Sequence, residues 1–228
     1  MGYSTYNIIV NNSVSNSRYG IALFNSDCNN IINNLVYTNQ YGIYLWDECT
    51  GNYIIDNEIM YSSQYGVYLW NSGWNTFYHN DFIWNANHAY IMISDSLQWD
   101  DGYPSGGNYW SDYTGADEYN GINQDIPGSD GIGDSPYFIV DGNQDNYPQM
   151  QQIREVPTFN INLTMGWNLI SIPLILFSNS VPDILASISG KWSVVKYYDT
   201  LDIADPWKSY RPGWTMIDMT EIDNNKGF

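Results

Sequence analysis

The sequence predicts a mostly β protein that begins with a parallel β-helix of about four short coils. After the coils we expect a loop-rich acidic cap, and then a small C-terminal α+β or β-rich domain. A Tyr-Gly motif returns at Tyr19-Gly20, Tyr41-Gly42 and Tyr65-Gly66, which indicates stacked repeats. Asparagines in pairs return with the same period: Asn7 and Asn12, Asn29 and Asn34, Asn52 and Asn57, and Asn75 and Asn80.

Residues 1–98 carry the coils. Each repeat has three apolar spots separated by Asn, Ser or Gly, which suits one coil with a short strand on each of three sides. Alternate strand residues face opposite ways, so we expect Ile43 and Leu45 to stack inside and Tyr44 and Trp46 to point outward. The repeated asparagines fit left-handed turns and stacked amide ladders along the axis. The glycines mark bends at which a Cβ atom would clash.

Two further segments follow the coils. Residues 99–155 are dense in Gly, Asp, Asn, Trp and Tyr, and we expect them to cap the C-terminal end of the β-helix. The aromatic side chains expected to pack on the last coil are Trp99, Tyr109, Trp110 and Tyr113. Pro157 marks a boundary, after which residues 156–228 form the C-terminal domain. Its patterns predict strands at 159–163, 167–173 and 192–198, and short helices at 181–188 and 216–222.

The spacing of the Asn and Tyr-Gly-Ile-Tyr-Leu motifs resembles the right-handed β-helix repeats of the NosD-like and pectate-lyase-like superfamily. The motifs of residues 102–113 and 130–148 resemble the end of such β-helices in secreted archaeal surface proteins. The resemblance covers about two thirds of the chain and implies a fold rather than an activity, because one fold carries many functions. Residues 166–173 resemble the start of a small archaeal surface domain. Because the chain stops at Phe228, that resemblance predicts a domain without its last strand.

The charge of the chain is strongly negative. It has 25 acidic and 7 basic residues, a formal net charge of −18, and no Lys or Arg between Arg18 and Arg154. Such a surface repels nucleic acid and anionic membranes and attracts metal cations. No apolar run reaches the length of a transmembrane helix. We therefore expect no nucleic-acid partner, no membrane insertion, and no lyase chemistry on acidic sugars, which usually needs a basic residue.

The acidic cap is the first candidate site. Its carboxylates are interleaved with Gly and Asn, and calcium prefers six to eight oxygen ligands on such flexible turns. The expected calcium ligands are Asp112, Asp117, Asp125, Asp130, Asp134, Asp141 and Asp145, with Glu118 beside them. The twelve-residue calcium loop pattern is missing, and solvated acidic loops with Asx turns are the alternative.

The second candidate is an outward ladder of aromatic side chains, which suits either an interface or the apolar faces of sugar rings. Its members are Phe24, Tyr44, Trp46, Tyr68 and Trp70. The alternative is that the cap or the C-terminal domain covers this ladder, because a second domain must dock somewhere.

Catalysis and copper binding are weaker hypotheses. A glycosidase needs paired carboxylates, and Asp56 and Asp81 lie near corresponding edges of adjacent coils with His79 between them; Asp95 is a third acid. Polar ladders at turns are the alternative explanation. Copper prefers clustered Met, His or Cys, whereas the candidates are scattered: Met60, His79, His88 and Met92.

Two cysteines and two glycosylation motifs fit an exported protein. Cys28 and Cys49 fall at nearly the same place on neighbouring coils, so we predict a disulfide, with two buried thiols as the alternative. Asn11 and Asn162 each begin an Asn-x-Ser/Thr sequon.

The sequence as a whole predicts an extracellular or cell-surface protein with a structural or adhesive role. We expect a surface-layer, sheath or filament component that is stabilised by calcium and assembles end to end into a fibre or layer. The alternative is a carbohydrate-binding or carbohydrate-active protein that contacts cell-surface glycans with its aromatic face. We expect no enzymatic activity.

Overall fold

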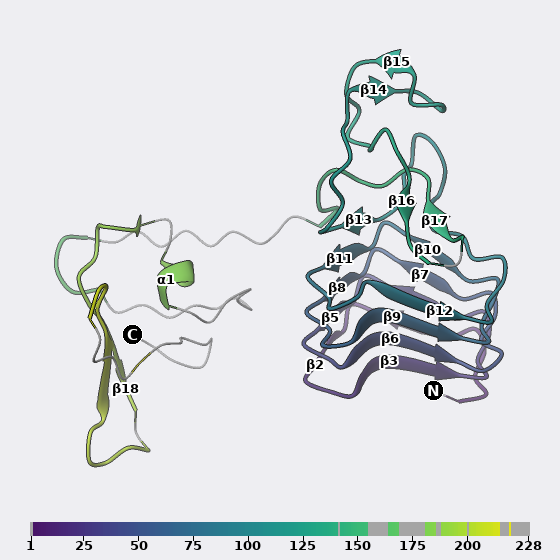
Figure 1. The fold of residues 1–228 in the computed structure, drawn as a ribbon. Coiled ribbons are helices and arrows are strands. Elements are labelled where there is room, and N and C mark those ends of the chain that lie inside the picture. Colours follow the sequence, from purple (N-terminus) through teal and green to yellow (C-terminus); the bar gives the residue numbers. More distant parts are fainter. Residues whose placement is uncertain are drawn as a thin grey trace. The chain divides into compact units, whose positions relative to one another are not determined.

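A computed structural model describes residues 2–140, 142–154, 164–168, 181–185, 188–199, 201–214 and 219. The chain divides into two compact units, residues 1–155 and residues 156–228. The first unit is a parallel β-solenoid whose coils stack on one another (Figure 1). The predicted parallel β-helix of about four coils is therefore confirmed.

Three parallel sheets form the sides of the solenoid, and each coil contributes one strand to each sheet. The first sheet contains β1 (Ile8–Val10), β4 (Asn30–Ile32), β7 (Tyr53–Ile55) and β10 (Thr76–Tyr78). The second contains β2 (Ser13–Ser15), β5 (Leu35–Tyr37), β8 (Glu58–Met60), β11 (Asp81–Ile83) and β13 (Tyr109–Trp110). The third contains β3 (Tyr19–Phe24), β6 (Tyr41–Trp46), β9 (Tyr65–Trp70) and β12 (Ala89–Met92).

The interior consists of apolar side chains stacked coil on coil. Ile43 and Leu45 are fully buried, as the alternation predicts, and the β-register places Leu45 between its counterparts Leu23 and Leu69. The glycines of the Tyr-Gly motif allow this close stacking. A Cβ on Gly42 would lie 2.5 Å from the carbonyl oxygen of Gly66 in the next coil. The predicted reason for these glycines is therefore confirmed.

Two asparagine ladders run along the solenoid axis, as predicted. In each ladder the Nδ2 of one asparagine donates to the Oδ1 of its counterpart one coil further on, at 2.8–3.0 Å. The first ladder contains Asn7, Asn29, Asn52 and Asn75, and the second contains Asn12, Asn34, Asn57, Asn80 and Asn108.

The expected left-handed geometry of these asparagines was wrong. The left-handed residues beside the second ladder are Asn11, Asn33, Asp56 and His79, with φ between 53° and 58°, and each stands one position before a ladder asparagine. The left-handed residue makes the turn, and the ladder asparagine turns its amide into the solenoid. There it satisfies buried backbone groups, as when Asn57 Nδ2 donates to the Ile55 carbonyl at 2.9 Å.

Aromatic side chains from the cap close the described C-terminal end of the coils. Trp99 stacks on Phe77 with ring centroids 4.4 Å apart, and Trp110 stacks on Phe82 at 4.3 Å. Both tryptophans are almost fully buried, so the predicted packing of the cap on the last coil is confirmed for them. Two short antiparallel hairpins complete the cap: β14 (Tyr119–Asn120) with β15 (Ile126–Pro127), and β16 (Tyr137–Phe138) with β17 (Gln144–Asp145).

The described part of the second unit holds α1 (Val181–Ile184) and an antiparallel pair, β18 (Val195–Tyr198) with β19 (Trp207–Tyr210). Val181, Leu185, Val195 and Met219 form its small core. The strand predicted at 192–198 corresponds to β18, and the helix predicted at 181–188 to the shorter α1. The strand predicted at 159–163, most of that at 167–173, and the helix predicted at 216–222 lie outside the described residues. The prediction of a domain without its last strand also concerns residues outside the described ranges.

Candidate functional site

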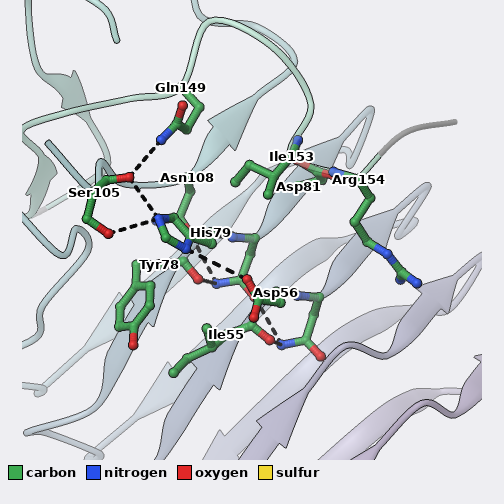
Figure 2. A network of polar contacts seen from close by, with 12 residues as sticks. Ile55, Asp56, Tyr78, His79, Asp81, Ser105, Asn108, Gln149, Ile153 and Arg154 are labelled. Atoms are coloured by element: carbon green, nitrogen blue, oxygen red, sulfur yellow. Dashed lines mark hydrogen bonds and ion pairs between the residues drawn. The ribbon is translucent and has the colours of Figure 1, made fainter. Parts of the chain in front are cut away.

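A polar network surrounds His79 at the turn after β10 (Figure 2). Its Nδ1 lies 3.7 Å from Asp56 Oδ1, and its Nε2 lies 2.9 Å from the Ser105 carbonyl oxygen and 3.3 Å from Ser105 Oγ. Gln149 Nε2 donates to the same carbonyl at 3.1 Å. A carbonyl oxygen only accepts, so Nε2 must carry the proton of this bond. That nitrogen is therefore not free to take a proton from Ser105, as a Ser-His-Asp nucleophile requires.

Asp81 lies beside this network and anchors the chain that leaves the cap (Figure 2). Its carboxylate is buried and accepts the backbone N–H groups of Ile153 at 2.8 Å and Arg154 at 3.0 Å. Burial raises the pKa of Asp81 to about 6, although both hydrogen bonds and the nearby Arg154 charge lower it. Arg154 Nη1 lies 3.9 Å from Glu58 Oε2, the neighbour of Asp81 in the sheet.

The three carboxylates of the glycosidase hypothesis, Asp56, Asp81 and Asp95, contact different parts of the fold. Asp56 contacts His79 and Asp81 holds Ile153 and Arg154, both near the edge between the first and second sheets. Asp95 lies in the turn after β12, between the third and first sheets, where its carbonyl accepts the Trp74 N–H at 2.9 Å. The topology therefore places Asp95 at a different corner of the coil.

His88 and Asp112 form a second polar cluster beneath the cap. His88 Nε2 lies 3.2 Å from Asp112 Oδ1 and 3.4 Å from Ser111 Oγ. Tyr137 donates its hydroxyl to Asp112 Oδ2 at 3.3 Å. Burial lowers the pKa of His88, while the Asp112 carboxylate opposes this shift. Burial also raises the pKa of Tyr137, followed by the Asp112 charge. Asp112, a predicted calcium ligand, thus fastens the cap to the last coil.

Three other cap carboxylates accept backbone hydrogen bonds within the loops. Asp117 accepts the N–H groups of Asp130 and Gly131 at 3.0 and 2.9 Å, and Asp134 accepts those of Glu118 and Tyr119 at 2.9 and 3.1 Å. Asp130 accepts the Ile132 N–H, Asp125 is exposed, and Asp141 lies outside the described residues. Within the described part of the chain, no three His, Cys, Asp or Glu side chains are placed to hold a metal ion. Calcium binding stays a prediction.

Asp145, another expected calcium ligand, lies buried at the end of the second asparagine ladder. It is fully buried, and its Oδ2 accepts the Asn108 N–H at 2.7 Å and the Trp110 Nε1–H at 2.9 Å. Its Oδ1 accepts the Tyr147 N–H at 3.1 Å. Burial raises the pKa of Asp145 to about 7, although these three donors favour the ionised form. The sequence carries no periodic signal for this position, because 37 residues separate Asp145 from Asn108.

The predicted aromatic ladder is one part of a broader surface, here called the aromatic face, on β3, β6, β9 and β12. Tyr68 stacks between Tyr44 at 4.9 Å and Tyr90 at 4.8 Å, and Trp46 stacks on Trp70 at 4.3 Å. Three more tyrosines and one phenylalanine extend these columns: Tyr19, Tyr41, Tyr65 and Phe24. Neighbouring rings bury Tyr44 almost completely, and this burial, followed by Tyr19 and Tyr68, raises its pKa. The Tyr44 hydroxyl therefore stays protonated.

The predicted disulfide is not formed, and Cys28 and Cys49 are free thiols. Cys49 is buried and belongs to an inward column with Ser72, whose Oγ accepts the Cys49 N–H at 3.3 Å. Cys28 stands in a left-handed turn next to Gly51, so the two cysteines occupy different columns. Burial raises the pKa of the Cys49 thiol, which keeps it protonated and unreactive. Of the two sequons, Asn11 is exposed in the turn after β1, and Asn162 lies outside the described residues.

Three parallel sheets of short strands, inward aliphatic columns and asparagine ladders define the first unit as a parallel β-solenoid. Residues 1–115 match the profile of the family described as periplasmic copper-binding protein (NosD). This match covers half of the chain, and the chain belongs to that family. It is therefore an extracellular or periplasmic β-helix protein. No curated protein and no solved structure shows significant similarity to the chain. In the described ranges, no helix is long and apolar enough to cross a bilayer.

The residues of this chain do not fit a copper site within the described ranges. Copper requires clustered His, Cys or Met donors. His79 and His88 stand in separate polar networks, and Cys49 is enclosed in the interior. Met60 and Met92 belong to different sheets, the first buried and the second exposed. We therefore assign no copper chemistry to these side chains.

Proposed function

We propose that this protein is a structural component of the cell surface, and that copies of it associate through the aromatic face. The observation that supports the proposal is the continuous stacking of Tyr and Trp side chains across four coils. Aromatic residues are the side chains most enriched at protein interfaces, where they supply large contact areas at a low entropic cost. On this proposal the protein is a surface-layer, sheath or filament component.

Charge favours a second copy as the occupant of this face. The whole chain carries a formal net charge of −18, so two copies repel each other across most of their surfaces. The strands of the aromatic face contain no charged residue: they read Tyr19–Phe24, Tyr41–Trp46, Tyr65–Trp70 and Ala89–Met92. Two such faces can meet without placing like charges opposite one another.

Ring orientation favours a flat protein partner over a sugar on this face. A sugar ring binds to the flat side of an exposed aromatic ring. In the aromatic face the flat sides cover one another, since the planes of Tyr44 and Tyr68 are inclined by only 13° and those of Trp46 and Trp70 by 22°. The ring edges and hydroxyl groups remain for contact, and these suit the packing of two flat surfaces.

Sedimentation velocity over a range of protein concentrations tests the proposal, with samples at low and high salt. We expect concentration-dependent association that strengthens with salt, because salt screens the repulsion but not the apolar contact. The double substitution Phe24→Glu with Trp46→Glu should weaken association by about tenfold or more. Trp84→Glu is the matched control, because Trp84 is 65% exposed and lies outside the face.

The proposal fails if the wild-type protein stays monomeric at every concentration and salt level. It also fails if the double variant associates as well as the wild type while circular dichroism shows both to be folded. An equal loss of association in Trp84→Glu would assign the effect to charge rather than to the aromatic face.

A further inference from the structure

An open groove of about 610 Å³ crosses the turns between the third and first sheets, which directly follow the strands of the aromatic face. It is lined by turn residues from successive coils, which follow β3, β6, β9 and β12. Its polar walls carry three carboxylates and two amides, and one exposed indole stands beside them: Asp27, Glu48, Asp95, Asn25, Asn71 and Trp74.

Two glycines lie in or beside this groove. Gly73 lines the groove. A Cβ atom at that position would lie 2.6 Å from the Asp95 carbonyl oxygen, so no larger residue fits there. The coil next to Trp74 has Gly51, whose N–H donates to the Trp74 carbonyl at 3.1 Å. Gly51 therefore has no side chain that could cover Trp74, and 70% of the Trp74 surface is exposed.

Hydrogen bonds fix part of the polar lining in place. Asp47 accepts the Nδ2 groups of Asn25 at 3.2 Å and of Asn71 at 3.0 Å, so both amides are held by one carboxylate. Thr50 donates its N–H and its hydroxyl to Asp27 Oδ1 at 2.8 and 3.0 Å. The groove is thus a rigid row of amide, hydroxyl and carboxylate groups that is set before any ligand arrives.

We infer that this groove binds a neutral oligosaccharide. A sugar ring has hydroxyl groups that pair with carboxylate and amide groups, and hydrogen bonds to a carboxylate are the stronger kind. It also has an apolar face that stacks on an exposed aromatic ring, which Trp74 provides and the stacked rings of the aromatic face do not. The groove follows successive coils, whose spacing of about 4.8 Å places polar groups at regular intervals along an extended ligand.

The charge of the lining selects among ligands. Asp27, Glu48 and Asp95 repel uronic acids, sulfated sugars and nucleic acids. The lining contains no Lys or Arg that could neutralise an anionic group. A neutral sugar carries no charge for these carboxylates to repel. Its hydroxyl groups pair with the polar lining, and its apolar face stacks on the Trp74 indole.

Isothermal titration calorimetry of the full chain tests the inference with defined probes. The neutral probes are hexasaccharides of glucose, mannose, xylose and N-acetylglucosamine, and the charged probes are oligogalacturonate and hexalysine. We expect at least one neutral hexasaccharide to bind with a Kd below about 1 mM, and oligogalacturonate not to bind.

Three variants locate the binding. Trp74→Ala should weaken it by about tenfold or more, and Glu48→Gln, on an exposed side chain, by about threefold. Trp84→Ala is the matched control, because Trp84 is also exposed in a left-handed turn, with φ of 48° against 56° for Trp74, but does not line the groove. It should bind as the wild type does.

The inference is overturned if none of the neutral probes binds, or if Trp74→Ala binds as tightly as the wild type. Binding of hexalysine alone would also overturn it, because the groove would then be an acidic site for basic peptides. These outcomes are independent of the sedimentation experiment, since the groove and the aromatic face share no residue.

Discussion

Replacement of the buried Asn57 by alanine should remove much more stability than the same truncation of the exposed Asn12 in the second ladder. The Nδ2 group of Asn57 donates to the carbonyl of Ile31 at 2.8 Å and to Asn80 Oδ1 at 3.0 Å. Its Oδ1 accepts the N–H of Asn34 at 2.9 Å. Asn57 and Asn34 are both fully buried, so water cannot replace these partners.

The magnitude follows from the groups that lose a partner. Asn57→Ala leaves the Asn34 N–H unpaired inside the solenoid and removes the amide that donates to the Ile31 carbonyl. A buried unpaired group costs about 1–3 kcal/mol and a lost hydrogen bond about 0.5–1.5 kcal/mol, so we expect a loss of about 2–4 kcal/mol in the free energy of unfolding. That is a large share of the roughly 5–15 kcal/mol of a typical domain.

Urea unfolding followed by circular dichroism measures this loss. Asn12→Ala is the matched control, because Asn12 belongs to the same ladder but is exposed, and its loss should stay below about 1 kcal/mol. Equal losses for the two variants, or a loss below about 1.5 kcal/mol for Asn57→Ala, would refute the claim that buried amide pairing sustains the coils.

Three further predictions concern packing, pH and calcium. Gly42→Ala should cost about 2–3 kcal/mol in urea unfolding, because the new Cβ would lie 2.5 Å from the Gly66 carbonyl oxygen; a neutral result would contradict the close stacking. Burial raises the pKa of Asp145 to about 7 and of Asp81 to about 6, so the folded state binds protons more tightly than the unfolded state between pH of about 4 and 7. Stability should therefore fall as the pH rises through this window, and Asp145→Asn should flatten the dependence of the urea midpoint on pH. If calcium orders the cap as the sequence predicts, a chelator should lower the melting temperature; unchanged melting would mean that hydrogen bonds such as those to Asp117 are sufficient.

The coils could be predicted from the sequence because their structure is periodic. Their contacts join residues that are about one repeat apart. Leu45, for example, pairs with Leu23 and Leu69 in the neighbouring coils, each about one repeat away in the sequence. A repeated pattern therefore predicts both the strand and its register. The Tyr-Gly glycines and the asparagine ladders follow from the same rule. The aromatic columns follow as well, although the sequence does not show that the rings cover each other's flat sides.

The polar anchors depended on the tertiary structure, because they join residues that no period relates. Asp81 binds the backbone of Ile153, 72 residues away, and Asp145 binds Asn108 across 37 residues. As a sequence pattern, Asp81 suggests a catalytic acid and Asp145 a calcium ligand. Burial and backbone partners make both of them parts of the scaffold.

The groove and the positions of the two cysteines also could not be predicted from the sequence pattern. The groove is lined by residues of different types at related turn positions. Asp27, Thr50 and Gly73, for example, show no repeated pattern in the sequence. Cys28 and Cys49 differ by only a few residues from a matched register, yet one lies in a turn and the other points inward. The sequence alone determined the solenoid, its interior and its acidic character, because these follow from periodicity and composition. Which carboxylates are buried, which rings are covered and where a groove opens was decided only by the packing of coil on coil.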